Sequence, residues 1–309
     1  MSERAMLKNR NINFTVSMLP LDSINDSTHV DEIDNRKVFN LHRKIAYVPF
    51  LKSHLTVEEL MKWDPSPLTE SLCLSAKMEK HRVKLIDSII RHTVFKEKVS
   101  VSYERINELL HIGLFERKGL MRDEVYLQLM RTINGLTDDK STERAWRLMI
   151  CITQAFPPSK LLSPFILRWY NQIDCSNNEI VRLALKRCHC NFNVYRISGP
   201  RGYSTTLDDV KYWFDEAYGK VPLFGNELAE IYTNSDLLTE INGAMLPKIV
   251  VRLTEMIRAL NGFSKEGVFR VSGDLQLVFK LKLMLSKNPD NIEYESFKDA
   301  AVPCSTLKF

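Results

Sequence analysis

Hydrophobic residues recur at the three- and four-residue spacing of an amphipathic helix through most of the chain, while the two-residue alternation of a strand is hardly visible. The first two helical faces consist of Val83, Ile86, Ile90 and Thr93, followed by Ile106, Leu109, Leu110 and Leu114. This pattern predicts an all-α protein that contains a helical bundle.

Four more amphipathic segments follow, and the one over residues 141–159 is apolar around most of its circumference. That helix is expected to be central, and Pro157 and Pro158 must end it. Asp123 and Glu124 begin the preceding helix, where negative charge suits the helix dipole. The inward positions predicted for these segments are Val125, Leu129, Ile133, Trp146, Met149, Ile150, Ile152, Phe156, Leu162, Phe165, Ile166, Trp169, Ile173, Val181, Ala184 and Cys188.

Two stretches lack a sustained helical period. Residues 1–40 are rich in Asn, Asp and Ser, and we expect them to form a flexible N-terminal segment. The stretch over residues 196–220 contains SGPRGYSTT, whose Gly, Pro and Ser content is typical of a domain boundary. We therefore place a domain junction there.

Beyond this junction, two helices are predicted on either side of a glycine-rich connection. The first covers residues 246–262, and the second covers residues 272–290 with Ser272 as its N-cap. The connection, GFSKEGVFRVSG at 262–273, contains a single arginine, Arg270, within an apolar run.

Two interpretations of Arg270 are open at this point. A loop arginine commonly pairs with the C-terminus of a neighbouring helix. The flanking glycines, however, let the backbone turn sharply, and Val268, Phe269 and Val271 are expected to anchor the loop in the core and leave the guanidinium outward. An arginine held in this way can stabilise charge on a transferring phosphoryl group, and a lysine lacks its planar fork of donors.

Composition narrows the class of protein further. The chain has 309 residues, of which 44% are hydrophobic, and this is enough for two cores. The opening MSERAMLKNR lacks the apolar region of a secretion signal, and no uncharged stretch approaches the length of a membrane span. Six cysteines occur without regular spacing. These features predict a cytoplasmic protein with reduced thiols and no transmembrane segment.

Positive charge is concentrated in the middle of the chain. Residues 41–200 contain 25 basic and 17 acidic residues, whereas the segments on both sides are slightly acidic. The excess would attract acidic partners such as protein tails, anionic lipid or nucleic acid. Since the charges are interleaved and form no five-residue basic run, ordinary solvation of the helices is the simpler interpretation.

No metal or cofactor site is predicted. Cys188, His189 and Cys190, with Cys175 upstream, are the residue types of a zinc site, but consecutive helical residues point about 100° apart and cannot converge on one ion. The sequence has no Walker-type phosphate loop, HExxH motif or nucleophile elbow. The four tryptophans are interpreted as core or boundary residues, so nucleic acid is not an expected partner.

The C-terminal segment resembles the start of a Rho GTPase-activating (RhoGAP) domain through VPLFG at 221–225 and EGVFRVSG at 266–273. This resemblance implies that Arg270 is the family's arginine finger, inserted into the nucleotide site of a Rho-family small GTPase. The GTPase would supply GTP and magnesium, so the chain itself would need no cofactor. It would be the activator of an enzyme instead of an enzyme.

The resemblance continues in ESFKDAAVPCSTLKF, where Asp299 and Lys308 match the family pattern. Ala301 and Thr306 stand where the family usually has a histidine and an aliphatic residue. By the same resemblance, Lys308 is expected to support the Arg270 loop or to contact the GTPase.

Only the N-terminal part of a RhoGAP domain is expected, over residues 221–309, because the sequence ends before the later helices of the family. Apolar positions such as Leu277, Leu281 and Met284 are then expected to lack their family partners.

The middle of the chain resembles the myosin tail homology 4 (MyTH4) domain, an all-helical bundle. The shared wording is DEVYLQL at 123–129, RAWRLM and FPPS within 144–159, and GPR at 199–201. The resemblance covers about residues 41–201, leaves 202–220 as a linker, and implies binding to microtubules or partner proteins. A MyTH4 domain followed by a RhoGAP domain is the order found in the Vilse (CrossGAP) group of Rho GTPase-activating proteins.

Two functional hypotheses follow. The first is a GTPase activator for Rho-family proteins of the Rac or Rho type, coupled to a cytoskeletal binding module in signal transduction. The second is a non-catalytic cytoskeletal or signalling adaptor that binds through the MyTH4 domain, with an inactive GAP part.

Overall fold

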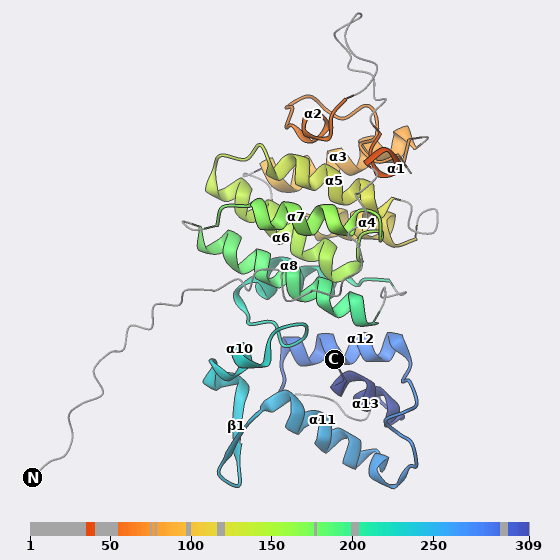
Figure 1. Ribbon diagram of the computed structural model, residues 1–309, viewed down its shortest axis with the longest axis vertical. Coiled ribbons are helices and arrows are strands. Elements are labelled where there is room, and N and C mark those ends of the chain that lie inside the picture. Colours follow the sequence, from red (N-terminus) through yellow and green to blue (C-terminus); the bar gives the residue numbers. More distant parts are fainter. Residues whose placement is uncertain are drawn as a thin grey trace, which may run out of the picture. The chain divides into compact units, whose positions relative to one another are not determined.

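The computed structural model describes residues 35–40, 55–74, 76–77, 79–96, 100–115, 121–175, 178–198, 204–290 and 296–308. All of them belong to one compact unit, Asp34–Phe309. Within these ranges helices dominate, and the only sheet is a two-stranded hairpin (Figure 1). The predicted all-α class is therefore confirmed, while most of the predicted flexible segment, residues 1–34, lies outside the described residues.

The N-terminal two thirds of the described chain form a helical bundle. Its elements are α1 (Asn35–Val38), α2 (Val57–Met61), α3 (Lys80–Phe95), α4 (Tyr103–Phe115), α5 (Arg122–Ile133), α6 (Asp139–Ala155), α7 (Ser163–Gln172), α8 (Glu179–Ser198), α9 (Leu207–Lys211), the π-helical turn η3 (Tyr212–Glu216) and the 3₁₀ turn η4 (Ala217–Gly219). The central helix α6 packs against α3, α5 and α8, as its apolar circumference predicts.

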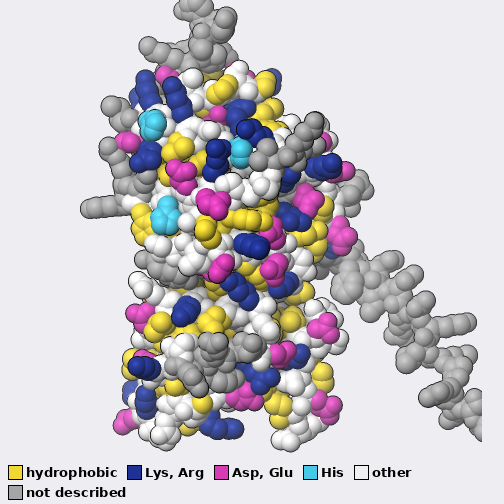
Figure 2. Space-filling view, turned by 180° about the vertical axis from the view of Figure 1, so that it is seen from behind, with side chains coloured by type: hydrophobic (Ala, Val, Ile, Leu, Met, Phe, Trp, Pro, Cys, Tyr) yellow, Lys and Arg dark blue, Asp and Glu magenta, His cyan; other side chains and the backbone are white. Residues whose placement is uncertain are grey.

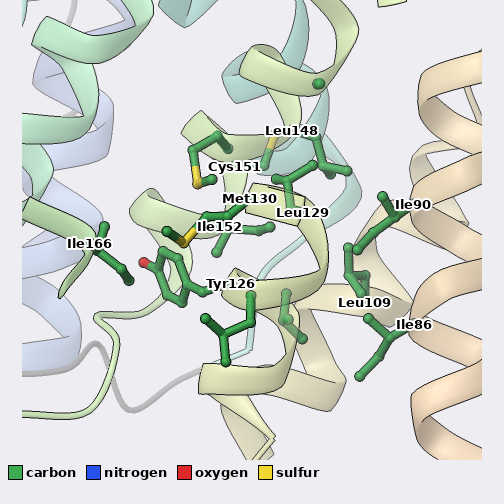
Figure 3. Close-up of a cluster of buried hydrophobic side chains, with 14 of the residues drawn as sticks. Ile86, Ile90, Leu109, Tyr126, Leu129, Met130, Leu148, Cys151, Ile152 and Ile166 are labelled. Atoms are coloured by element: carbon green, nitrogen blue, oxygen red, sulfur yellow. The ribbon is translucent and has the colours of Figure 1, made fainter. Parts of the chain in front are cut away.

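Large apolar side chains from five of these helices meet in one core (Figure 3). Ile86 and Ile90 of α3 approach from one side, and Tyr126 of α5 fills the centre. Tyr126 is fully buried, and its hydroxyl donates to the Phe156 carbonyl oxygen at 2.7 Å, so the ring ties α5 to the end of α6. Of the inward positions predicted from sequence, Ile133, Phe165 and Ile173 remain half-buried and the others are buried.

Two predicted boundaries of this bundle are wrong in the structure. Val38 and Phe39 were assigned to the flexible segment, yet both side chains are buried, and Phe39 pairs with Cys73 in an isolated β-bridge. The predicted linker over 202–220 contains α9 and η3, and Trp213 in η3 is fully buried in the bundle core. The cause is the apolar content of this stretch, which outweighs the turn signals just before it.

The start of α5 carries two buried acidic side chains that connect separate parts of the bundle. Glu124 is completely buried and accepts hydrogen bonds from the backbone nitrogens of Leu72, at 3.0 Å, and Cys73, at 2.7 Å, and from the Gln128 amide, at 2.7 Å. Asp123 accepts from the backbone nitrogen and hydroxyl of Ser159 at 2.8 and 2.5 Å. Both residues therefore hold loops in place, a stronger role than the predicted contact with the helix dipole.

A second group of helices follows the bundle. It contains α10 (Leu228–Tyr232), η5 (Ser235–Leu237), the antiparallel strands β1 (Leu238–Ile241) and β2 (Ala244–Pro247), α11 (Lys248–Ala259), η6 (Gly262–Ser264), α12 (Leu275–Lys287) and α13 (Ala301–Leu307). Leu281 of α12 is fully buried in a cluster with Leu253 and Val302, and Leu277 and Met284 pack against it. The expectation that these residues lack partners is wrong, because apolar residues of α11 and α13 share this cluster with them.

Helix α12 also contacts the bundle directly. The Tyr212 hydroxyl donates to the Ser286 carbonyl oxygen at 2.6 Å, and the Tyr195 and Phe279 rings lie 5.9 Å apart. An ion pair between Lys186 of α8 and Glu230 of α10 adds a contact at 2.7 Å. The second group of helices is thus attached to α8 and η3 by both polar and aromatic contacts.

Lys282 of α12 is buried beside this contact, and burial lowers its pKa to about 7. Its ammonium lies 5.4 to 5.5 Å from the Phe279 and Phe224 rings, an arrangement that partly offsets the lost hydration. The unfolded chain holds this proton up to about pH 10.4, whereas the folded chain releases it near pH 7. Burial of this lysine therefore lowers the free energy of unfolding, and the loss grows as the pH falls from about 10 to 7.

We expect Lys282→Met to stabilise the protein at pH 7.5 by on the order of 1–3 kcal/mol, and to give a smaller gain at pH 10. Urea unfolding at the two pH values measures both differences. Lys280→Met, on the exposed side of the same helix, is the matched control and should change little. Equal destabilisation by Lys282→Met at both pH values would contradict this account.

Candidate functional site

The candidate site is the connection between α11 and α12, residues 262–273, referred to below as the Arg270 loop. It begins just after Asn261, whose left-handed backbone (φ 58°) ends α11. Gly267 also has a positive φ of 70°, and its carbonyl oxygen accepts from the backbone nitrogens of Arg270 and Val271 at 2.7 and 3.2 Å. The glycine thus permits a tight turn that a side chain would strain.

The Arg270 guanidinium points into solvent, as the sequence predicts. Its side chain is 81% exposed, and its ion pair with Glu266, at 4.0 Å, is long and involves a side chain that is 99% exposed. The guanidinium lies beside the Gly267 backbone: a Cβ added to this glycine would be only 3.1 Å from the Arg270 Nε. The donors of Arg270 are therefore available to a partner.

The base of the loop is held firmly. Val268 is buried in a small cluster with Ile257 of α11 and Cys304 of α13. The backbone nitrogen of Gly273 donates to the Ser305 hydroxyl at 2.8 Å, and this bond is buried. An exposed arginine is thus carried on a loop whose two sides are fixed to neighbouring helices.

Gly273 is required for this close approach. A Cβ at this position would lie 2.7 Å from the Ala301 carbonyl oxygen and 2.7 Å from the Cα of Val302, both of which are backbone atoms. We expect Gly273→Ala to destabilise the protein by about 1–3 kcal/mol, as overpacking does, in urea unfolding. Gly219→Ala is the control, since nothing lies within 4 Å of its added Cβ. Similar midpoints for the two variants would show that the approach is not tight.

Two details of the loop differ from the prediction. Phe269 and Val271 were expected to anchor it, but their side chains are 44% and 57% exposed, and Val268 alone of the three is buried. The N-cap of α12 is Asp274 instead of Ser272, because the Asp274 carboxylate accepts from the backbone nitrogen of Leu277 at 3.0 Å.

Lys308 lies at the end of α13, and its side chain is exposed. Among the described residues it forms no hydrogen bond or ion pair with the Arg270 loop, so the support that was predicted for Lys308 comes from Ser305. Ser305 was missed because a serine inside an apolar helix gives no local signal of its distant partner. Asp299 lies just before α13, and its carboxylate accepts from the backbone nitrogen of Ala301, the first residue of that helix, at 3.0 Å.

The described residues bring together no group of three or more His, Cys, Asp or Glu side chains suited to a metal ion. Cys188 and Cys190 are buried in α8, and burial raises their thiol pKa values to about 12 and about 11. Protonated, inaccessible thiols of this kind are core residues. Nor does any described helix have the length and apolar content that crossing a membrane requires.

The architecture is an all-α helical bundle to which a second, smaller set of helices is attached. Comparison with protein families gives the more particular result that residues 106–211 match the model of the MyTH4 domain. The matched range continues through α9, past the predicted end at residue 201. It thereby supports a MyTH4 domain in the bundle.

Similar proteins include a kinesin-like protein and a myosin of solved structure. The kinesin-like protein KIN-14I of Oryza sativa subsp. japonica is 22% identical over 129 residues, covering 40% of this chain and 10% of that protein. The solved structure of the human myosin 7b C-terminal MyTH4-FERM domain in complex with the harmonin-a PDZ3 domain has a TM-score of 0.43 and 20% identity, over 52% of this chain and 33% of that chain. The chain thus spans a tenth of the length of its kinesin-like relative.

Proposed function

We propose that this protein activates a Rho-family small GTPase through Arg270 and is linked to the cytoskeleton through its MyTH4 domain. The observation that carries the first part is the exposed guanidinium on a loop held by Val268 and Gly273. A GTPase provides its own nucleotide, magnesium and attacking water, and an arginine supplied in trans stabilises the charge that develops on the transferred phosphoryl group.

The physical requirement for such a residue is a fixed backbone with free donors. Burial of Val268 and the bond from Gly273 to Ser305 fix the backbone, and the outward side chain leaves the donors free. The resemblance of EGVFRVSG to the RhoGAP domain supplies the class of partner. Lys308, exposed at the end of α13, is proposed as a second contact with the GTPase.

Single-turnover GTP hydrolysis tests this proposal. A Rac- or Rho-type GTPase loaded with GTP is mixed with excess protein, and phosphate release is followed. We expect faster release than with the GTPase alone. The activity would be contradicted if Rac-, Rho- and Cdc42-type GTPases each hydrolysed GTP at the same rate with and without the protein.

The second candidate function is that of a cytoskeletal adaptor that acts through the bundle alone. It is favoured by the match of residues 106–211 to the MyTH4 domain and by the kinesin-like relative. Co-sedimentation with microtubules over a salt series tests it, since binding driven by the basic middle segment should weaken as salt rises. A protein that stays in the supernatant at low salt would contradict the microtubule version.

A further inference from the structure

A groove of about 680 Å³ lies along α3 in the bundle, well within the size range of ligand sites. One side of it is a single face of α3, because the lining positions recur every three or four residues. These positions are Lys84, Asp87, Ser88, Arg91, His92 and Phe95, followed by Lys96. Residues 67–69 and Arg105 of α4 complete the lining.

The acidic side chain in this lining, Asp87, is already neutralised. It is buried and accepts from Arg91 Nε at 2.8 and 2.9 Å and from the Leu68 backbone nitrogen at 3.1 Å. Arg91 also donates to backbone carbonyl oxygens of the preceding loop and lies 4.7 Å from the Trp63 ring centroid. This pair therefore fixes the wall of the groove and contributes no net charge.

The remaining charges in the lining are positive. Lys84, Lys96 and Arg105 are exposed, and none of them forms an ion pair with another residue that the structure describes. His92 lies among them, and burial together with the charges of Arg105 and Lys96 lowers its pKa. Figure 2 shows Lys and Arg side chains over the bundle on the face that it displays, with Asp and Glu side chains among them.

We propose that this groove binds an acidic polypeptide segment in extended conformation. Lys84 lies in α3 and Lys96 is the residue directly after this helix, so the helical rise places them about 18 Å apart, which is the reach of roughly five or six extended residues. A single phosphate group could satisfy only one end of such a row, whereas successive carboxylates can follow it. Phe95, 38% exposed in the same lining, offers an apolar contact to the same segment.

This inference rests on the proposed binding role of the bundle and assigns it to particular residues. Basic side chains at intervals along a groove recognise charge and spacing more than sequence, so the partner is defined by its chemistry: several carboxylates within a short flexible stretch. The contribution of each exposed pair is small, and binding is therefore expected to be salt-dependent.

Fluorescence anisotropy with the full chain tests the assignment. The probe is a fluorescein-labelled peptide of five glutamates and one phenylalanine, and its control replaces every glutamate by glutamine. We expect the acidic peptide to bind more tightly, and the double variant Lys84→Glu/Lys96→Glu to weaken it about tenfold at low salt, with a smaller effect at high salt. Lys160→Glu, an exposed charge outside the groove, is the matched control.

A second readout reports the site itself. Carboxylates bound near His92 stabilise its imidazolium, so the His92 pKa measured by NMR should rise on addition of the acidic peptide. Arg105→Glu should reduce both this rise and the affinity. Circular dichroism and the unfolding midpoint establish that these exposed variants remain folded.

The inference is overturned if the glutamine peptide binds as well as the glutamate peptide, or if both charge-reversal variants bind like the unchanged protein. Binding of inositol phosphates or phosphatidylserine vesicles without binding of the peptide would also overturn it. If the double variant still pellets with microtubules, the groove is excluded as the microtubule-binding site, while the cytoskeletal role stays in place. Peptide binding without microtubule pelleting would exclude that role and retain the groove.

Discussion

Replacing Arg270 by alanine is expected to remove the acceleration of GTP hydrolysis by a Rho-family GTPase. Arginines that act in trans contribute roughly 10³ to 10⁵ in rate, or about 4 to 7 kcal/mol of activation free energy. Arg270→Lys should also fail, because an ammonium keeps the charge but loses the planar fork of donors. Single-turnover phosphate release measures the loss.

The structure allows a clean separation of this effect from unfolding. The Arg270 side chain is 81% exposed, so its removal should change the free energy of unfolding by no more than about 0.5 kcal/mol. Arg258→Ala, at an exposed position near the end of α11, controls for loss of a nearby positive charge. An Arg270→Ala protein that stimulates hydrolysis like the unchanged chain would refute the role assigned to this residue.

The second large effect is expected on stability, from Glu124→Ala. This change leaves the buried backbone nitrogens of Leu72 and Cys73 without their acceptor and also removes one of the two acceptors of the Gln128 amide, which keeps the Val83 carbonyl oxygen. Unsatisfied buried donors cost about 1–3 kcal/mol each, and we expect a total loss on the order of 3–5 kcal/mol in urea unfolding.

Glu124→Gln should fall between the alanine variant and the unchanged protein, because one oxygen remains to accept while the new amide meets a donor. Asp139→Ala, an exposed acidic residue in the first turn of α6, is the control and should change the midpoint little. A Glu124→Ala midpoint equal to that of the control would mean that the connection to residues 72 and 73 is dispensable.

The helices of the bundle could be predicted because burial follows the helical period. Val83, Ile86 and Ile90 are buried where their spacing places them on one face of α3. The role of Glu124 could not be predicted in the same way, since its backbone partners lie 51 and 52 residues away. A local sequence pattern predicts where a helix begins or ends, but it does not predict which distant loop packs against that end.

The Arg270 loop shows the same division between local and distant information. Its place between two helices and its outward guanidinium follow from the glycines and the single arginine, and the structure agrees with both. The N-cap was misplaced because Ser272 and Asp274 are both capping residue types, and only the geometry selects Asp274. The aromatic run at 212–214 was a signal of a core segment that the neighbouring Gly and Pro residues obscured.

The hydroxyl that fixes the Arg270 loop belongs to Ser305, 32 residues further along the chain from Gly273. A single proteolytic cut between α12 and α13 would leave every residue of the loop intact and covalently attached to α11. It would nevertheless remove the covalent link between the loop and Ser305, whose position would then depend only on the packing of α13 in the core. The position of the Arg270 loop therefore depends on a helix that lies far from it in the sequence.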